Sequence, residues 1–172
     1  MSSWILRVGA ADRRLLQAMA VRRRPALSRF MREWTRLGDP VAVLALGTLA
    51  LLGGVGGHPG ALQAVFTLAL SHLFSQVLKR GISRPRPVLP EGLRSLVEAP
   101  DRFSFPSGHA SATLALALPL ASTLPPVPGL LLIVGSLLVG VSRCYLGVHY
   151  PGDVVAGWSL ALLAWGAVGL LG

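Results

Sequence analysis

Charged side chains are scarce in this sequence, and they are unevenly placed. Lysine, arginine, aspartate and glutamate make up 13% of the 172 residues, whereas a soluble domain carries about 25%. Residues 40–78 contain none of the four, and after Arg102 only Arg143 and Asp153 carry a formal charge. Long uncharged stretches argue against a soluble protein and are typical of an integral membrane protein.

Cysteine and acidic residues are also rare. The single cysteine, Cys144, excludes an intramolecular disulfide. The seven acidic residues form no cluster suited to magnesium. A formal net charge of +9 would suit a nucleic-acid-binding protein. The arginines stand beside apolar runs of membrane length, however, so we expect no nucleic-acid partner and attribute the charge to attraction by anionic lipid.

Five stretches are long and apolar enough to cross a bilayer, which takes about 20 residues of helix. Each must be helical, because hydrocarbon offers no partner for a bare N–H or C=O group. Short turns with proline and glycine join the first two stretches and the third to the fourth. The sequence predicts an all-α, polytopic transmembrane helix bundle with about five spans, at residues 40–57, 60–78, 107–124, 126–142 and 153–172.

The segment before the first span has a different pattern. Apolar positions such as Leu15, Leu27 and Trp34 alternate with nine arginines, and a proline breaks the segment near its middle. This pattern predicts two short amphipathic helices that lie on the membrane surface, with their arginines toward lipid headgroups. We therefore expect an N-terminal surface region, residues 1–39, and a transmembrane domain, residues 40–172.

Polar residues return at three predicted span boundaries, and the first of these motifs is "KRGISRPRP", residues 79–87. Lysine offers a point charge and arginine a planar fork, the two common ways of holding phosphate oxygens. Lys79 and Arg86 are therefore candidate substrate-binding residues. A positively charged cytoplasmic flank of the second span would give the same pattern.

The second motif is "FPSGHA", residues 105–110. Ser107 stands where a helix is predicted to begin and can cap it, and the free N–H groups of that first turn form an anion site. Gly108 lets an anion approach the backbone closely, and His109 would stand beside that anion. An ordinary capped helix accounts for the same residues.

The third motif is "RCYLGVHYPGD", which runs from Arg143 to Asp153. His149 and Asp153 are four residues apart, so their side chains can meet if the intervening turn is helical. A carboxylate that accepts a hydrogen bond from one ring nitrogen fixes the tautomer and leaves the other nitrogen free as a nucleophile. Arg143 would then clamp an anion. A simple structural hydrogen bond is the alternative.

The order of the spans places these three motifs on one side of the membrane. Two spans separate the N-terminus from the first motif, and the third and fourth spans return the chain to the same side. Two histidines among several cations and a helix N-terminus are suited to phosphoryl transfer.

In order and spacing, these motifs resemble the type-2 phosphatidic acid phosphatase family of integral membrane lipid phosphatases. The family signature is Lys, six residues, Arg-Pro; then Pro-Ser-Gly-His; then Ser-Arg, five residues, His, three residues, Asp. Here the three parts are residues 79–87, 106–109 and 142–153, and the resemblance covers about residues 40 to 170.

The resemblance implies a phosphatase that needs no metal or other cofactor, in agreement with the lack of an acidic cluster. Its substrate would be a lipid phosphate: phosphatidic acid, phosphatidylglycerol phosphate, or a prenyl phosphate or diphosphate. His149 would be the nucleophile that forms a phosphohistidine. Asp153 would orient it, and His109 would be the general acid and later the base. The remaining candidates would bind the phosphate of the substrate, namely Lys79, Arg86, Ser107, Gly108 and Arg143.

Two other functions fit part of the pattern. Vanadium-dependent haloperoxidases share the motif, but they resemble larger soluble proteins. A non-catalytic lipid-binding or scaffold protein with a relic phosphate site is the second alternative, although every catalytic position of the signature is intact here. No residue pattern distinguishes one lipid tail from another or indicates an oligomeric state.

Sidedness follows from the N-terminal region. Basic residues that flank the first span tend to stay in the cytoplasm, and nine arginines lie within residues 1–39. We therefore expect a protein of the cell (inner) membrane whose active site faces the cytoplasm. Many bacterial members of the family have six spans, so the topology reverses if residues 4–37 cross the membrane.

Overall fold

The computed structural model describes residues 3–54, 57–99 and 101–171, with the backbone alone for residues 3–8. Within these ranges every regular element is helical, and a lone β-bridge joins Pro85 to Phe103. The all-α prediction is confirmed for the described part of the chain. The elements are α1 (Ser3–Val21), α2 (Pro25–Thr35), the 3-10 helix η1 (Arg36–Gly38), α3 (Pro40–Gly53), α4 (Gly57–Ile82), α5 (Gly108–Thr123), α6 (Pro126–Tyr145) and α7 (Pro151–Gly169).

Proline and glycine set many of the helix boundaries. Four helices begin at a proline, whose missing N–H group would be unpaired in a first turn in any case; these prolines are Pro25, Pro40, Pro126 and Pro151. Helix α3 ends at Gly53, and the next residue, Gly54, adopts the left-handed conformation with φ of 63°. The break near Pro25 that the sequence indicated separates α1 from α2.

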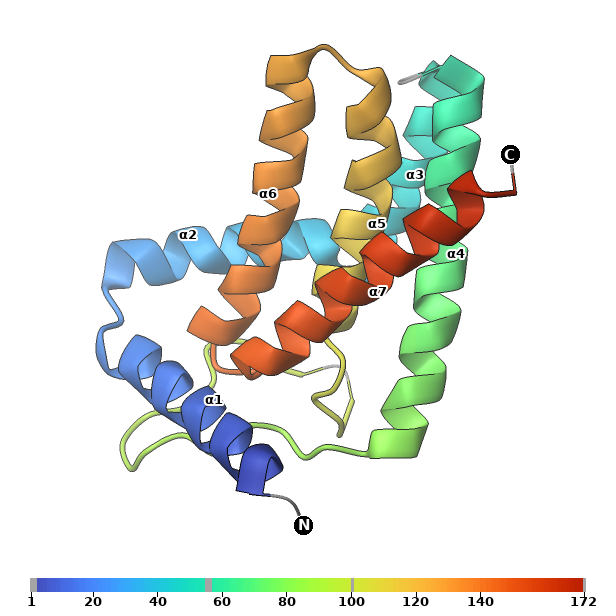
Figure 1. The fold of residues 1–172 in the computed structure, drawn as a ribbon. Coiled ribbons are helices and arrows are strands. Elements are labelled where there is room, and N and C mark those ends of the chain that lie inside the picture. The colour runs from blue at the N-terminus through green and yellow to red at the C-terminus, as the bar shows by residue number, and fades with distance from the viewer. Residues whose placement is uncertain (1–2, 55–56, 100, 172) are drawn as a thin grey trace.

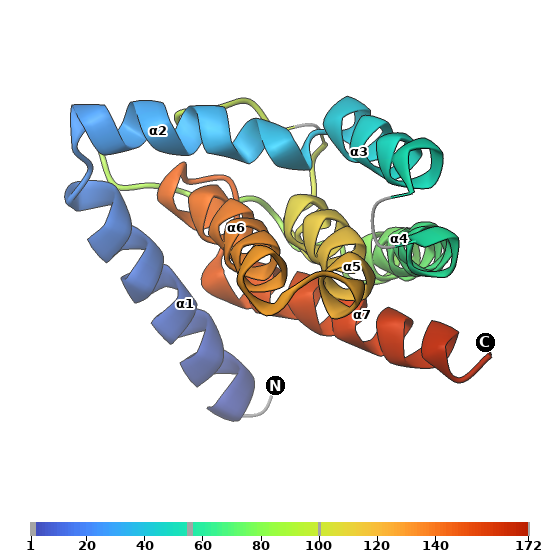
Figure 2. The same ribbon diagram turned by 90° about the horizontal axis from the view of Figure 1, so that it is seen from above.

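Helix α5 forms the centre of the bundle. In Figure 2 it lies between α4 and α6, with α7 along one side and α3 near the other. Of its 16 residues, 11 are buried. A helix so enclosed is held on all sides, and its N-terminal residues, which include Gly108 and His109, are held with it.

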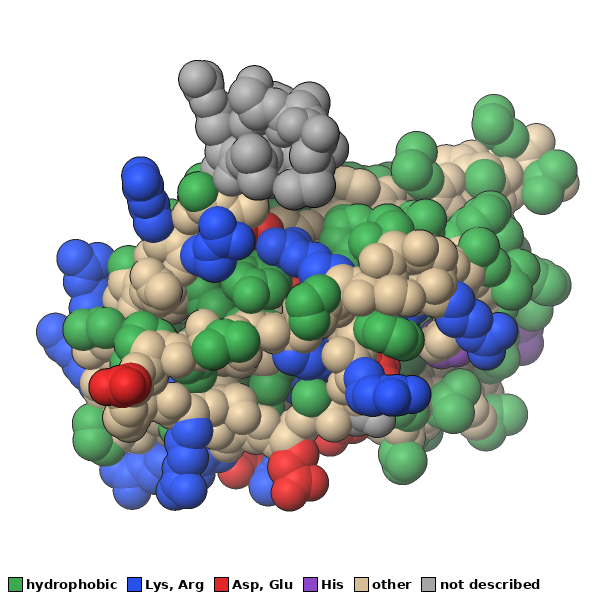
Figure 3. Space-filling model, turned by 90° about the horizontal axis from the view of Figure 1, so that it is seen from below, with side chains coloured by type: hydrophobic (Ala, Val, Ile, Leu, Met, Phe, Trp, Pro, Cys, Tyr) green, Lys and Arg blue, Asp and Glu red, His purple; other side chains and the backbone are tan. Residues whose placement is uncertain are grey.

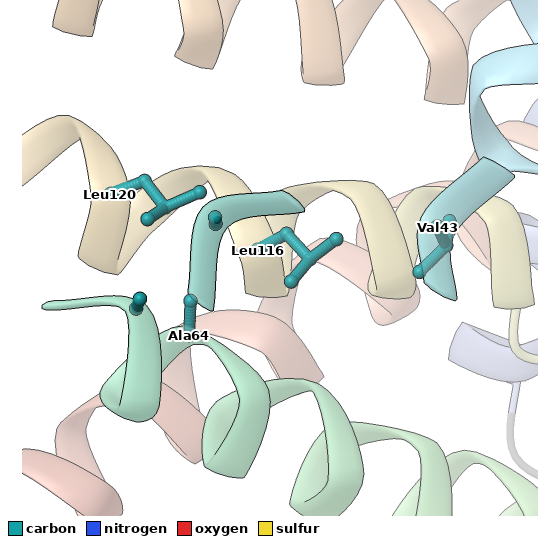
Figure 4. Close-up of a cluster of buried hydrophobic side chains, with 6 residues drawn as sticks. Val43, Ala64, Leu116 and Leu120 are labelled. Carbon is teal, nitrogen blue, oxygen red and sulfur yellow. The ribbon is translucent and has the colours of Figure 1, made fainter. Parts of the chain in front are cut away.

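Small side chains let the neighbouring helices approach α5 closely. Ala61 and Ala64 of α4 are completely buried and form one cluster with Leu116 and Leu120 of α5. Figure 4 shows Ala64 and Val43 on helices beside these two leucines. In a membrane, close packing of this kind replaces the hydrophobic effect as the force that holds helices together.

Three helices, α4, α6 and α7, are long and apolar enough to cross a membrane. A fourth span is possible if α2 with η1 and α3, which bend by 57°, count as one. Helices α3 and α5 have 14 and 16 residues, which is short for a bilayer core. The predicted transmembrane helix bundle is therefore confirmed, with three to four candidate spans. The predicted count of five spans is not confirmed.

The described part of the N-terminal region contains the two helices α1 and α2, and α2 packs on the bundle. Their amphipathic character is not confirmed. Figure 1 shows α2 running across α6. Met31 of α2 is buried against Tyr145 and Leu146, and the indole N–H of Trp34 donates to the main-chain oxygen of Gly135 at 3.0 Å. The placement of α1 and α2 on a lipid surface stays a prediction.

One end of the bundle carries the polar motifs. Helices α4 and α6 end there, α5 and α7 begin there, and the connection 83–107 crosses it (Figure 1). Figure 3, which views this end, shows lysine and arginine side chains together with several acidic ones. The three motifs thus share one side, as the predicted span order requires.

Candidate active site

Hydrogen bonds to main-chain oxygens join the three motifs at this end. The N–H of Ser107 donates to the main-chain oxygen of Asp153 at 2.9 Å, which links the start of α5 to the start of α7. Arg86 Nη1 donates to the main-chain oxygen of Val148 at 2.8 Å. Segments far apart in the sequence are therefore fixed around His149.

The hydrogen bonds of His149 define its tautomer. The side chain is 2% exposed. Its Nδ1 lies 2.7 Å from the main-chain oxygen of Ser104, which can only accept, so Nδ1 carries the proton. Its Nε2 lies 2.9 Å from Arg86 Nη1, which can only donate. Nε2 therefore holds the free lone pair that a nucleophile needs.

Burial also keeps His149 neutral. Loss of hydration lowers the pKa of its imidazole to about 4, and Arg86 and Arg143 act in the same direction, while Asp153 opposes them. The ring is therefore unprotonated at Nε2 near neutral pH.

Asp153 is fully buried, but its first partners differ from the expected one. Oδ2 accepts from the Tyr150 N–H at 2.8 Å, and Oδ1 accepts from Arg84 Nη1 at 2.7 Å. The distance from Oδ2 to His149 Nδ1 is 3.8 Å, too long for a hydrogen bond. The carboxylate therefore caps its own helix and influences His149 by its negative charge at close range. His149 Nδ1 instead donates its hydrogen bond to the main-chain oxygen of Ser104.

Lys79 and Arg86 converge on one carboxylate. Lys79 Nζ lies 2.6 Å from Asp101 Oδ2, and Arg86 Nη2 lies 2.9 Å from Asp101 Oδ1. Burial raises the pKa of the Asp101 carboxyl, but the two cations outweigh it and hold that pKa below its usual value. Two cations that share one anion in this way have the spacing to hold two oxygens of a phosphate.

The start of α5 offers unpaired polar groups. Ser107 occupies the N-cap position, yet its side chain makes no capping hydrogen bond, so the predicted cap does not form. Its buried Oγ has no hydrogen-bond partner among the described residues. A Cβ added at Gly108 would meet nothing within 4 Å among them, so an anion has room to approach the backbone here.

His109 pairs with an acidic residue outside the three motifs. Its Nε2 lies 3.0 Å from Asp39 Oδ1, at the junction of η1 and α3. Gly38 fits closely against it, since a Cβ there would lie 2.8 Å from His109 Cδ2. The bend that ends the N-terminal region therefore contacts the predicted general acid.

Arg143 is 2% exposed, and Nη1 donates to Thr35 Oγ1 at 3.0 Å. Its Nε is buried without a partner among the described residues. A pocket of about 330 Å³ with several charged side chains in its wall opens beside it. The pocket is lined by Arg32, Thr35, Arg36, Asp39, Pro40, Val97, Glu98, Ala99, His109 and Arg143. An anion bound in this pocket would lie beside His109 and Arg143.

Sequence reasoning missed four residues that complete this arrangement. Asp39, Arg84 and Ser104 contact His109, Asp153 and His149, and Asp12 binds Arg84. Arg84 stands inside the first motif, whose basic residues suggested function, but it was not among the candidate site residues. Asp12 and Asp39 lie far from the motifs in sequence, and the main-chain oxygen of Ser104 leaves no signal in residue type.

Within the described residues, no group of three or more His, Cys, Asp or Glu side chains is placed to hold a metal ion. Cations of the site instead lie beside each histidine, with Arg86 against His149 and Arg143 lining the same pocket as His109. Such an arrangement can stabilise the negative charge of a phosphoryl group.

Comparison with known proteins identifies the family. Residues 60–170 match the PAP2 superfamily, a range that contains all eight predicted site residues. Phosphatidylglycerophosphatase B of Bacillus subtilis is 32% identical over 170 residues, which cover 91% of this chain and 80% of that protein. Decaprenylphosphoryl-5-phosphoribose phosphatase of Mycolicibacterium smegmatis is 46% identical over 89 residues. That match covers 51% of this chain and 47%, or about half, of the relative.

Solved structures agree with the sequence matches. The Bacillus subtilis phosphatidylglycerolphosphate phosphatase, described as a transmembrane PAP2 type enzyme, superposes with a TM-score of 0.77 at 32% identity, over 95% of this chain and 85% of that one. LpxE of Aquifex aeolicus, at 23% identity, has a TM-score of 0.81 over 91% and 93% of the two chains and shares the fold. The predicted family is confirmed: the chain belongs to the PAP2 superfamily.

Proposed function

We propose that the protein is a metal-independent membrane lipid phosphatase in which His149 is the nucleophile. The observation that carries the proposal is the hydrogen bonding of His149. Nδ1 is protonated against Ser104 O at 2.7 Å, so Nε2 presents its lone pair toward Arg86 at 2.9 Å. The same Arg86 joins Lys79 at one anion, at present Asp101. Attacking atom and phosphate-binding cations are therefore adjacent.

The reaction has two steps. In the first, Nε2 of His149 attacks phosphorus, the bond to the lipid oxygen breaks, and His109 gives its proton to that oxygen. In the second, His109 takes a proton from water, the water oxygen attacks phosphorus, and the phosphorus–nitrogen bond breaks to release inorganic phosphate. A proton held by one histidine thus leaves with the alcohol and is replaced from water.

The cations stabilise the charge that develops on the phosphoryl oxygens. Substrate must displace the Asp101 carboxylate from Lys79 and Arg86, because both cations are paired with it. Arg86 then turns from Nε2 of His149 to a phosphate oxygen. Ser107 Oγ and Arg143 Nε, which lack partners among the described residues, supply further donors.

An apolar groove supports a lipid rather than a soluble phosphate. It has a volume of about 600 Å³, and its walls come from α2, η1, α3, α5 and α6. Val139 lines this groove, and Gly38 packs between Val139 and His109. A lipid tail lying in the groove would therefore end close to the general acid.

The proposal includes five membrane crossings with the site on the cytoplasmic side. Helices α3 and α5 would cross as short helices, α5 enclosed by its neighbours and α3 at the edge of the bundle, where bilayer thinning accommodates them. Nine arginines within residues 1–39 favour a cytoplasmic N-terminal region.

Phosphate release by detergent-purified protein in excess chelator tests the function. The panel contains phosphatidic acid, phosphatidylglycerol phosphate, and a prenyl phosphate and diphosphate. Phosphatidylglycerol phosphate comes first, because the relative that covers most of the chain is a phosphatidylglycerophosphatase. Release from at least one lipid supports the proposal. No release from any of them would favour a lipid-binding or scaffold protein with a relic site.

A further inference from the structure

A chain of charged contacts links the N-terminal helix α1 to Asp153. Arg84 Nη2 donates to Asp12 Oδ2 at 2.8 Å, and Arg84 Nη1 donates to Asp153 Oδ1 at 2.7 Å. Asp12 is 6% exposed and Asp153 is 0% exposed. One guanidinium therefore bridges two buried carboxylates, one from α1 and one from the catalytic turn, which we define as residues 149–153.

Asp12 also holds the catalytic turn directly. Its Oδ1 accepts from the Gly152 N–H at 2.8 Å, one of the otherwise free donors at the start of α7. The fit is tight, since a Cβ added at Gly152 would lie 2.7 Å from Asp12 Oδ2. Arg84 is fixed from another direction, with its guanidinium carbon 4.1 Å from the centre of the Tyr150 ring.

A helix that only lay on lipid headgroups would gain nothing from burying a carboxylate. Burying a charge is costly unless it is paired, and here the neighbours Arg13 and Arg14 are exposed while Asp12 points inward. The ion pair therefore has a role inside the molecule.

We propose that Asp12 and Arg84 are positioning residues for the proposed phosphatase reaction, on which this inference rests. Asp12 holds Arg84 and the first turn of α7, Arg84 holds Asp153, and the turn so fixed aims His149 at the phosphorus. The N-terminal helix is then part of the active site's support as well as a surface element. Neither residue contacts the reacting atoms.

Asp12→Asn tests this directly, with Arg14→Gln as a control that removes an exposed charge from the same helix. We expect kcat of Asp12→Asn to fall by about a hundredfold, because small displacements of reacting groups are costly. KM and the inhibition constant of vanadate should change by less than about twofold, since the phosphate-binding cations are untouched. Arg14→Gln should match the wild type.

Gly152→Ala perturbs the same contact from the other side, so the test survives if Asp12→Asn does not fold. The new methyl group would displace the Asp12 carboxylate, whereas Gly166→Ala, on the same helix, meets nothing within 4 Å among the described residues. We expect the first variant to lose kcat with little change in KM, and the second to keep it.

A double-mutant cycle separates positioning from general stability. If Asp12 acts through Asp153, Asp12→Asn will reduce kcat much less in an Asp153→Asn background than in the wild type. The inference would be overturned if the kcat losses of Asp12→Asn and Asp153→Asn simply multiplied in the double variant. It would also be overturned if Asp12→Asn and Gly152→Ala both kept wild-type kcat. A wild-type protein that releases no phosphate would instead overturn the proposed function, so the two failures are distinguishable.

Discussion

Nδ1 of His149 lies 2.7 Å from the main-chain oxygen of Ser104. A carbonyl oxygen only accepts, so this contact sets the tautomer without any help from a carboxylate. Asp153, at 3.8 Å from the same nitrogen, is left to act by charge and by capping α7.

His149→Ala is expected to abolish turnover, since it removes the attacking atom; the loss should be roughly 10⁴-fold or more. The variant should still fold in detergent, and phosphate release under saturating lipid is the measurement. His72→Ala is the matched control, because His72 is an exposed histidine of α4. Substantial activity in well-folded His149→Ala would refute the assignment.

Asp153→Asn is expected to slow the chemistry and leave phosphate binding almost intact. The amide stabilises a positively charged His149 poorly, so kcat should fall by about a hundredfold or more. The protein should also lose about 1.5–3 kcal/mol of stability, because a buried charge-assisted hydrogen bond to Arg84 is weakened. If vanadate affinity collapses while kcat holds, Asp153 is a binding residue.

The pH dependence of kcat/KM should reflect the low pKa of His149. A proton on Nε2 removes the nucleophile, and the pKa lies at about 4 rather than at its ordinary 6.5. Activity should therefore persist as the pH falls through 6.5 and decline only as the pH approaches the lowered pKa. In Arg86→Gln a positive neighbour is gone, so the remaining activity should decline at a higher pH. An acid limb near 6.5 that does not move in Arg86→Gln would contradict this.

Asp101→Asn should strengthen phosphate binding. The Asp101 carboxylate occupies Lys79 and Arg86, and it competes with any anion for them. We expect the inhibition constant of vanadate to fall by about fivefold, or about 1 kcal/mol, the upper range for a partly exposed ion pair. Glu91→Gln, an exposed change in the same connection, is the control. A higher inhibition constant would show that Asp101 orders the cations instead of masking them.

The sequence was sufficient for the parts of this molecule that depend on local pattern. Apolar runs indicated the helices, and prolines such as Pro25 and Pro126 marked where they begin. The span order placed Lys79, His109 and His149 at one end. These predictions needed only periodicity, turn chemistry and the hydrogen-bonding demands of a bilayer.

The remainder depends on contacts that no local pattern encodes. Asp12 reaches Arg84 across 72 positions, and Asp39 reaches His109 across 70. The partner of His149 is a main-chain oxygen, which every residue type possesses. Helices α3 and α5 have 14 and 16 residues, shorter than the apolar runs that predicted them, because Gly54 and the turn at Pro125 end them early.

Sidedness gives the last prediction: the connection 83–107 and the active site face the cytoplasm. The arginines of residues 1–39 favour this orientation, with two crossings before Lys79.

Thiol labelling in intact cells is the measurement. Cys144 is buried, and Cys144→Ser removes any remaining background labelling. In that background, Ser95→Cys places a thiol in the connection and His58→Cys places one at the opposite end of the bundle, both at exposed positions. A membrane-impermeant thiol reagent added to intact cells should label His58→Cys and reach Ser95→Cys only after lysis. The reverse pattern would place the active site outside, and the phosphatase would then act on lipids of the outer leaflet.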